Sequence, residues 1–402
     1  MPIGTPFHSR TSALCVSHNW RVWSGYLVAS SYETQHEHEY HAIRHSAALI
    51  DVSPLYKYDV NGRDALKFVN RVITRDAAKC AVNQAMYGCL CNEAGKVIQD
   101  GTVFRLGEER FSFHLAEPSL RWFQLNATGM DVKIEDISEQ VAAVALQGPT
   151  SREIVKQLCG PELERLKFFR FTFADVGRIR AIISRTGYTG DLGYEIWVPA
   201  RDAGELWDIL MRVGKPYGIT PAGMLALDMA RLEAGFILLD VDYTSAEKAL
   251  IPSQRYSPFE IGLNWTVGLD KENFVGQKAL LEEQANGSPR KLVGLEIDWD
   301  GYEALYREAG LAPQLPTAAW RGGAPVYQGK RQIGQATTGG WSPTIKQYIA
   351  LATVQSKFSQ PGTELFMETT VEFVRRQVKA TVVKLPFFDP PRKRQKAVGR
   401  RQ

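Results

Sequence analysis

The pattern of hydrophobic residues changes near residue 287, and this change constrains the fold more than any other feature of the sequence. Before Asn286-Gly287-Ser288-Pro289, segments with helical periodicity are interspersed with short apolar runs that predict strands. After it, the chain is a series of short β-type runs separated by glycine and proline. We therefore expect a mixed α and β region followed by a smaller all-β domain, either a barrel or a sandwich.

The first region contains several individually predictable elements. Apolar residues at positions 65, 68, 69 and 72 form one stripe at helical spacing, which predicts a helix from Asp64 to Val72. Apolar runs bounded by turn residues predict strands over 87–90, 97–106, 110–115 and 141–146. Further helices are expected over 151–158, 203–213 and 221–232.

The composition excludes several classes of protein. Of the 402 residues, 44% are hydrophobic and 23% are charged, which is ordinary globular usage and not that of a disordered or fibrous chain. No apolar stretch approaches the length of a membrane helix, and the start lacks the apolar run of a signal peptide. Five dispersed cysteines form neither a disulfide framework nor a zinc-binding C-x-x-C pair. We expect a cytoplasmic protein that binds no metal and no membrane.

The net charge of +4 does not indicate a nucleic-acid partner. Six of the 48 basic residues lie in residues 392–402, so the remaining 42 face 44 acidic residues in the body of the chain. A nucleic-acid-binding protein needs its basic surplus spread over one face of the fold. A terminal basic run is more typical of a solvated end, and we expect no nucleic-acid partner.

Two motifs resemble known sites without matching them. His41 and His45 would share one face of a predicted helix, but Ala42 follows His41 where the zinc-protease pattern requires glutamate. Gly187, Gly190 and Gly193 are spaced G-x-x-G-x-x-G, and not as the dinucleotide motif G-x-G-x-x-G.

The glycine-rich segment nevertheless resembles the signature of a known family. Residues 185–196 read RTGYTGDLGYEI, and this segment is similar to the signature of the aminomethyltransferase family, which comprises the glycine-cleavage T-protein and its tetrahydrofolate-dependent demethylase relatives. Further similar segments follow in the family's order: LQGP at 146–149, RLEAG at 231–235, SPFEIGLNW at 257–265, GWSPT at 340–344, PGT at 361–363 and LPF at 385–387.

The resemblance implies a three-lobed α+β fold, with a C-terminal β-barrel domain and a central hole that holds folate. It divides the chain into an aromatic-rich N-terminal extension (1–45), a two-lobed folate-binding region (46–288), the barrel domain (289–390) and a basic tail (391–402). The implied cofactor is tetrahydrofolate.

The resemblance also assigns binding residues. Glu195 matches the carboxylate that anchors the pterin, whose edge presents a pair of donor hydrogens; otherwise it is an outward-facing strand residue. Arg231 matches an arginine near the folate and the reacting atoms; otherwise it is an arginine in an ion pair with a neighbouring acid. Tyr87 aligns with a folate-side tyrosine. Tyr188 and Trp265 either line the folate slot or belong to the core.

Two departures from the T-protein pattern bear on the reaction. T-proteins carry two adjacent aspartates where this chain has Gln99 and Asp100, and the alignment places the catalytic aspartate on Asp100, with a turn residue as the alternative. The segments around Tyr32 and Tyr243 are more similar to O-demethylases of methoxylated aromatic acids, which have tyrosines near the methyl donor; otherwise both are structural. Tyr243 would then protonate a leaving oxygen.

These features favour a tetrahydrofolate-dependent methyltransferase that demethylates a small O-, N- or S-methylated substrate. The first alternative is the glycine-cleavage T-protein, an aminomethyltransferase that releases ammonia from an aminomethyl-lipoyl carrier. The second alternative is a non-catalytic folate-binding accessory protein.

Overall fold

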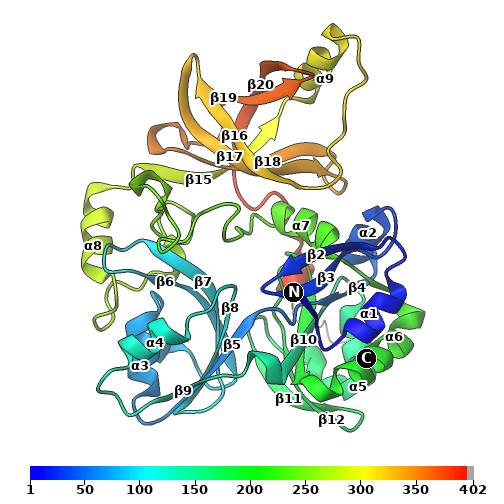
Figure 1. The fold of residues 1–402 in the computed structure, drawn as a ribbon, viewed down its shortest axis with the longest axis vertical. Helices are drawn as coiled ribbons and strands as arrows, with labels where there is room; N and C mark the ends of the chain where they lie inside the picture. Colours follow the sequence, from blue (N-terminus) through cyan, green and yellow to red (C-terminus); the bar gives the residue numbers. More distant parts are fainter. Residues whose placement is uncertain (396–402) are drawn as a thin grey trace, which may run out of the picture.

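The computed structural model describes residues 1–395. In it, the runs predicted between residues 50 and 140 form an antiparallel sheet (Figure 1). Its strand order is β6-β7-β8-β5-β9. The strands are β5 (Tyr56–Asn61), β6 (Gln84–Cys91), β7 (Val97–Arg105), β8 (Arg110–Leu115) and β9 (Lys133–Asp136). The helix predicted at 64–72 is α3 (Ala65–Val72), whose apolar stripe and Phe123 of α4 (Leu120–Asn126) pack in one cluster with residues of the sheet.

A second, six-stranded sheet is covered by helices on both faces. Its order is β11-β12-β13-β10-β4-β14. The strands are β4 (Ala47–Asp51), β10 (Val141–Gln147), β11 (Phe171–Val176), β12 (Ile179–Ser184), β13 (Gly193–Pro199) and β14 (Ile219–Pro221). Leu49 packs toward α5 (Ser151–Cys159) and α6 (Ala203–Gly214), whereas Ile50 packs toward α2 (Glu37–His45) and α7 (Met224–Glu233). Because both faces are buried, central strands such as β10 are apolar over nearly their whole length, here from Val141 to Leu146.

The start of α7 differs from the sequence prediction. Residues 219–221 form strand β14, which pairs in parallel with β4, and the helix begins only at Met224. Pairing with β4 supplies the backbone hydrogen bonds that an extra helical turn would have made.

The first 45 residues pack onto this second lobe. They form a small sheet of β1 (Ile3–Gly4), β3 (Tyr26–Ser31) and β2 (Asn19–Trp23), together with α1 (His8–Leu14) and α2. The Nε of Arg10 on α1 donates to Asp208 on α6 at 3.0 Å. The segment expected as an extension is thus continuous with the lobe beside it.

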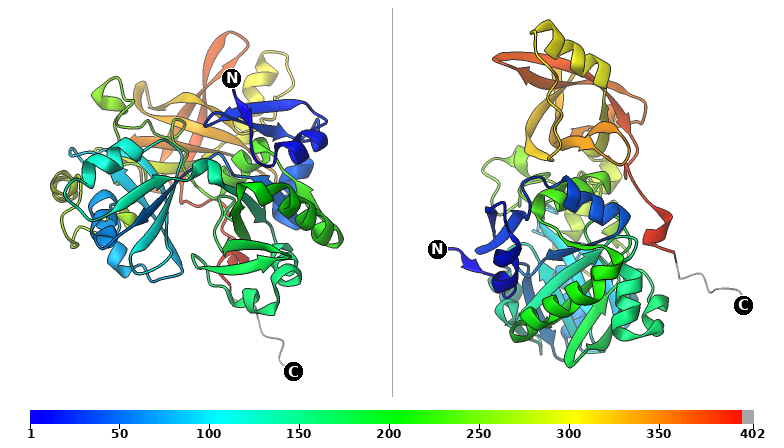
Figure 2. Two further views of the ribbon diagram at one scale, coloured as in Figure 1. Left: turned by 60° about the horizontal axis from the view of Figure 1, so that its bottom comes forward. Right: turned by 90° about the vertical axis from the view of Figure 1, so that its right-hand side faces the viewer.

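The all-β domain is a closed barrel, with the strand order β15-β18-β17-β16-β19-β20. Its strands are β15 (Arg290–Ile297), β16 (Trp320–Gln328), β17 (Arg331–Ser342), β18 (Gln347–Gln355), β19 (Glu364–Val371) and β20 (Val374–Val383), and α9 (Trp299–Glu308) follows β15. The three-lobed α+β fold with a C-terminal barrel is confirmed (Figure 2). A long irregular segment and α8 (Gln277–Asn286) lead from α7 to the barrel.

Candidate active site

The carboxylate of Asp100 is held by two phenol groups on the inner face of the first sheet. Asp100 lies on β7, opposite Cys89 of β6. Tyr87 on β6 donates a hydrogen bond to its Oδ2 at 2.5 Å, and Tyr243, from the segment after α7, donates to its Oδ1. Burial raises the pKa of Asp100 above its ordinary value, while the two phenol hydrogen bonds oppose that rise. The sequence-predicted residues Tyr87, Asp100 and Tyr243 therefore form one cluster, which we call the Asp100 cluster.

Gln99, the neighbour of Asp100, points to the opposite face of the sheet. It is paired with Leu90, which packs in the α3 and α4 core, and it faces away from Asp100 because successive residues of a strand point to opposite faces of the sheet. Its amide donates to the Ser119 hydroxyl at 2.6 Å and accepts from the Glu117 backbone at 3.0 Å. The replacement of an aspartate by Gln99 thus serves the packing of α4 and leaves the surroundings of Asp100 unchanged.

The glycine-rich loop carries Tyr188 to the neighbourhood of this cluster. The Gln147 side chain lies inside the loop and bonds the Thr186 carbonyl at 3.2 Å; a Cβ on Gly187 or Gly193 would come within 2.3 Å of it. The glycine spacing therefore reflects close packing around Gln147 and not a phosphate site. The Tyr188 ring stacks on Phe236, and burial raises the pKa of its hydroxyl, with the charge of Asp100 contributing.

Glu195 stands on β13, directly after this loop. Its Oε2 accepts a hydrogen bond from the Thr186 hydroxyl at 2.5 Å. Within residues 1–395, no side chain or backbone group donates to Oε1. Burial raises the pKa of Glu195, and the Thr186 hydrogen bond partly offsets this. One carboxylate oxygen is thus oriented by the protein and the other is available to a ligand.

Arg231 is fully buried between α7 and the barrel. Its Nη1 donates to Asp242 at 2.5 Å and to the Phe236 carbonyl at 3.1 Å, and its Nη2 donates to Thr338 of β17 at 3.0 Å. The guanidinium is 0% exposed. In this structure Arg231 therefore holds the segment that leads to Tyr243 against the barrel, and its charge also acts on the Tyr188 hydroxyl.

Trp265 and Tyr32 occupy contrasting environments. Trp265 is 56% exposed, its ring stacks on Tyr87 with centroids 5.9 Å apart, and the Arg75 guanidinium lies over it at 5.3 Å. Tyr32 is 4% exposed and belongs to the core cluster of the second lobe, together with residues of α5 and α6. The structure thus brings Trp265 to the edge of the Asp100 cluster and places Tyr32 in a different core.

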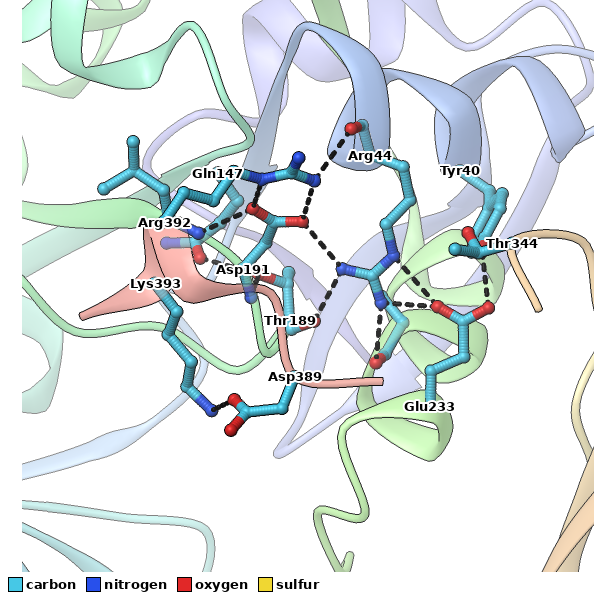
Figure 3. A network of polar contacts seen from close by, with 12 residues as sticks. Tyr40, Arg44, Gln147, Thr189, Asp191, Glu233, Thr344, Asp389, Arg392 and Lys393 are labelled. Carbon is cyan, nitrogen blue, oxygen red and sulfur yellow. Dashed lines mark hydrogen bonds and ion pairs between the residues drawn. The ribbon is translucent and has the colours of Figure 1, made fainter. Parts of the chain in front are cut away.

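A buried ion-pair network, which the sequence analysis missed, supports the glycine-rich loop (Figure 3). Arg44 of α2 bonds Glu233 at 2.6 Å and Asp191 of the loop at 3.3 Å. Arg392 reaches the same Asp191 through two hydrogen bonds, of 2.6 and 2.8 Å. The Arg44–Glu233 and Arg392–Asp191 pairs are far apart in sequence, so no local spacing could have indicated them.

The expectation that the basic run is a solvated end is wrong for Arg392 and Lys393, whereas Arg394 is exposed. Lys393 is 6% exposed, and Arg185 donates to the carbonyls of Lys393 and Gln395 at 3.0 and 2.7 Å. The basic residues are thus used as partners of Asp191 and as backbone acceptors for a buried arginine. The rest of the run, residues 396–402, lies outside the described residues.

The described residues contain neither a metal-binding group nor a helix that could span a membrane. The exposed rings of His41 and His45 stack at 5.5 Å. Within residues 1–395 there is no group of three or more histidine, cysteine or acidic side chains placed to hold a metal. In the same residues, none of the helices is both long and apolar enough to cross a membrane.

Comparison with known proteins settles the family. Residues 8–271 match the domain family described as GCVT N-terminal domain, and residues 307–389 match the glycine cleavage T-protein C-terminal barrel domain. The chain belongs to the aminomethyltransferase (glycine-cleavage T-protein) family.

Individual members of the aminomethyltransferase family align over nearly the whole chain. A protein named aminomethyltransferase from Thermoanaerobacter sp. (strain X514) is 35% identical over 87% of this chain and 88% of its own length. One from Halalkalibacterium halodurans is 33% identical over 91% of this chain and 92% of its own. The crystal structure of the glycine cleavage system aminomethyltransferase T from Bartonella henselae superposes with a TM-score of 0.81 at 25% identity, covering 97% of this chain and 99% of that one. Because the match starts at residue 8, most of residues 1–45 lies inside the aminomethyltransferase fold.

Proposed function

We propose that this chain is a tetrahydrofolate-dependent aminomethyltransferase, which moves a one-carbon unit from an aminomethyl donor to tetrahydrofolate and releases ammonia. The observation that carries the proposal is the partly buried Asp100 carboxylate, held by Tyr87 and Tyr243 in a member of this family. The five free thiols support a reducing, cytoplasmic setting.

The residues present fit tetrahydrofolate. The pterin edge presents two parallel N–H donors, and a carboxylate accepts both in one plane. Glu195 offers such a carboxylate with Oε1 available, and Thr186 fixes its orientation. A charge-assisted contact of this kind contributes about 1.5 to 3 kcal/mol and also sets the direction in which the ligand points.

Two observations favour the aminomethyltransferase over the demethylase. Gln99, which the sequence analysis took as a departure from T-proteins, points away from Asp100 and bonds Ser119 and Glu117. The residues before 45, taken as a second departure, lie mostly inside the family match. Gln99 and the N-terminal residues therefore concern packing, whereas Tyr243, from the other divergent segment, does contact Asp100.

The side chains supply proton handling and orientation. Tetrahydrofolate supplies the nucleophilic nitrogen that accepts the one-carbon unit. Asp100, with its pKa raised by burial, can hold a proton that the donor nitrogen needs in order to leave as ammonia. Tyr87 and Tyr243 fix the plane of the carboxylate, and Glu195 holds the far end of the ligand. Holding the reacting atoms in line supplies much of the rate.

A second candidate function is demethylation of a small methylated compound, such as a methoxylated aromatic acid, and one observation favours it. The Tyr243 hydroxyl touches Asp100 directly, so a phenol is placed next to the group where one-carbon transfer would take place. An ether that loses its methyl group leaves as an alkoxide or phenoxide and needs a proton, and a tyrosine has a matched pKa of about 10.

One experiment separates these functions. The protein is incubated with tetrahydrofolate and either an aminomethyl-lipoyl carrier protein or a panel of methoxy-, dimethylamino- and dimethylsulfonio-compounds, and the folate products are identified by mass spectrometry. Methylenetetrahydrofolate together with ammonia supports the aminomethyltransferase. Methyltetrahydrofolate formed from a small compound supports the demethylase, and folate binding without transfer to any product indicates an accessory protein.

A further inference from the structure

The chain leaves the barrel after β20 and runs back to the second lobe, where residues 384–395 contact two parts of the candidate active site (Figure 2). The amide of Phe388 donates to the Glu233 carbonyl, at the end of α7, at 2.9 Å. The guanidinium of Arg392 bonds Asp191 of the glycine-rich loop. We call residues 384–395 the C-terminal segment. It joins the end of α7 to the glycine-rich loop.

The ammonium of Lys393, in this segment, lies against an aromatic ring of the chain that follows α7. It is 4.8 Å from the centroid of the Phe236 ring and 6.0 Å from that of Phe168. Within residues 1–395, the one carboxylate at ion-pair distance is that of Asp389, at 3.7 Å (Figure 3). Lys393 is buried, and a cation is held over an aromatic ring more strongly where water is excluded. The Phe236 ring is therefore a main partner of this charge.

The backbone around Lys393 is fixed by two guanidinium groups. Arg185 donates to the carbonyls of Lys393 and Gln395 at 3.0 and 2.7 Å, and Arg152 donates to the same Gln395 carbonyl at 2.9 Å. Within the described part of the chain, neither arginine has a carboxylate at ion-pair distance. Both are therefore committed to the backbone of the C-terminal segment, and the Lys393 side chain reaches Phe236 from a set position.

Phe236 in turn supports Tyr188. The two rings stack with their centroids 5.6 Å apart and their planes at 24°. The Tyr188 hydroxyl donates a hydrogen bond to the carbonyl of Ile237, the next residue. Both ends of the Tyr188 side chain thus rest on the Phe236–Ile237 pair, so a shift of the Phe236 ring displaces Tyr188.

The same pair of residues leads to the Asp100 cluster. Ile237 belongs to the hydrophobic cluster that includes Tyr243, and Tyr87 packs against that cluster. Both of these tyrosines donate to Asp100. Burial raises the pKa of Tyr188 and the charge of Asp100 adds to the rise, so the Tyr188 hydroxyl lies within electrostatic reach of Asp100. The contacts therefore run without a break from the C-terminal segment to the Asp100 cluster.

We infer that Lys393 is a positioning residue for the folate site: its charge holds the Phe236 ring, and through that ring it fixes Tyr188 beside the Asp100 cluster. This inference rests on the proposed function. Lys393 acts at one remove, because its ammonium contacts Phe236 and not Tyr188 or Asp100. A lysine that merely anchored the chain end would contribute to stability and leave the affinity for tetrahydrofolate unchanged.

The test is a double-mutant cycle between Lys393 and Phe236, which isolates the coupling between the two side chains. Dissociation constants for tetrahydrofolate are measured by calorimetry for the wild-type protein, Lys393→Met, Phe236→Leu and the double variant. Lys393→Gln is a second neutral variant, and Lys393→Arg restores the charge. Arg394→Gln is the matched control, since it removes the neighbouring charge from a side chain that is 53% exposed. Urea unfolding shows that each variant is folded under the conditions of the titration.

Lys393→Met and Lys393→Gln should each weaken the binding of tetrahydrofolate about fivefold, whereas Lys393→Arg and Arg394→Gln should stay within twofold of the wild-type protein. In the Phe236→Leu background, Lys393→Met should change the affinity less than twofold. Wild-type affinity in both neutral variants, or a fivefold loss that persists in the Phe236→Leu background, overturns the positioning role. A wild-type protein that does not bind tetrahydrofolate overturns the proposed function instead, and the positioning role with it.

Discussion

The hydroxyl of Tyr243 donates a hydrogen bond to Oδ1 of Asp100, across a separation of 143 residues. Tyr87 donates to the other oxygen of the same carboxylate. Three side chains from β6, β7 and the segment after α7 thus share one buried charge, and removing any of them changes the environment of the other two.

Substitution Asp100→Asn should lower turnover at least 100-fold and change the affinity for tetrahydrofolate less than threefold. The amide keeps the shape of the side chain and loses its ability to take up a proton. Steady-state kinetics together with calorimetry separate the two effects.

Gln99→Met is the matched control. It should cost about 1 to 3 kcal/mol of stability through its lost hydrogen bonds and leave turnover within threefold. Unchanged turnover in Asp100→Asn would remove Asp100 from the reaction.

Substitution Tyr243→Phe distinguishes the two candidate reactions. If the donor is an ether, loss of the hydroxyl should lower turnover roughly 100-fold or more, because the leaving oxygen loses its acid. If the donor is an aminomethyl group, Tyr243→Phe and Tyr87→Phe should behave alike, with losses of about tenfold from the less ordered carboxylate. The comparison uses rates measured with the donor that proves active. Equal rates for wild type and both variants would contradict both accounts.

The affinity for tetrahydrofolate should fall as the pH is lowered, beginning above the ordinary pKa of a glutamate. Burial raises the pKa of Glu195, so the carboxylate takes up a proton earlier than an exposed one and can then accept fewer hydrogen bonds. Glu195→Gln should bind at least tenfold more weakly at pH 7.5 and should lack this pH dependence. Calorimetric titrations from pH 5 to 8 measure both. A pH dependence that persists in Glu195→Gln would assign it to another group.

Substitution Arg392→Gln should destabilise the protein by about 2 to 3 kcal/mol. It leaves the Asp191 side chain, which is 0% exposed, with Arg44 as its remaining ionic partner. The loss of stability stays below that of a fully buried pair because the Arg392 side chain is 36% exposed. Urea unfolding measures the change. Arg394→Gln removes a more exposed pair with Asp389 and should cost less than 1 kcal/mol. Equal effects of the two substitutions would show that the buried pair has no special role.

Stability should decline between pH 6.5 and pH 3, with a contribution from His114. Burial lowers the pKa of His114 to about 3, and its ring stacks on Trp197 at 4.1 Å. The unfolded chain, with a histidine pKa of about 6.5, takes up one more proton than the folded protein in this window, so each pH unit costs up to about 1.4 kcal/mol. In His114→Phe, the slope of the unfolding free energy against pH should fall by up to about 1.4 kcal/mol per pH unit, which corresponds to one proton. Urea unfolding at several pH values measures this slope. Equal slopes for the wild-type protein and His114→Phe would show that other titratable groups cause the loss of stability.

Much of the fold could be predicted because local patterns specify it. The stripe of Ala65, Phe68 and Val72 identifies α3, and continuous apolar runs such as that of β10 identify strands buried on both faces. Strand β14 was missed because its conformation depends on pairing with β4, which no local pattern reveals. Closure of the barrel likewise depends on pairing between β15 and β20, whose partner residues are more than 80 positions apart.

The candidate site was predictable in part. Resemblance identified Asp100 and Glu195, and the structure shows how each is held. That Gln99 and Asp100 face opposite sides of the sheet follows from the alternation of side chains along the predicted strand 97–106. No local pattern, however, indicates that Tyr243 meets Asp100 across 143 residues.

The docking of residues 392–395 has a consequence for biosynthesis. A chain emerging from the ribosome exposes Asp191 and the glycine-rich loop long before Arg392 is translated. Until residues 392–395 have emerged, Asp191 lacks one of its two cations and Arg185 lacks the carbonyl acceptors of Lys393 and Gln395. The glycine-rich loop therefore gains these contacts only when residues 392–395 dock, so a chain cut before Arg392 would keep the loop without them.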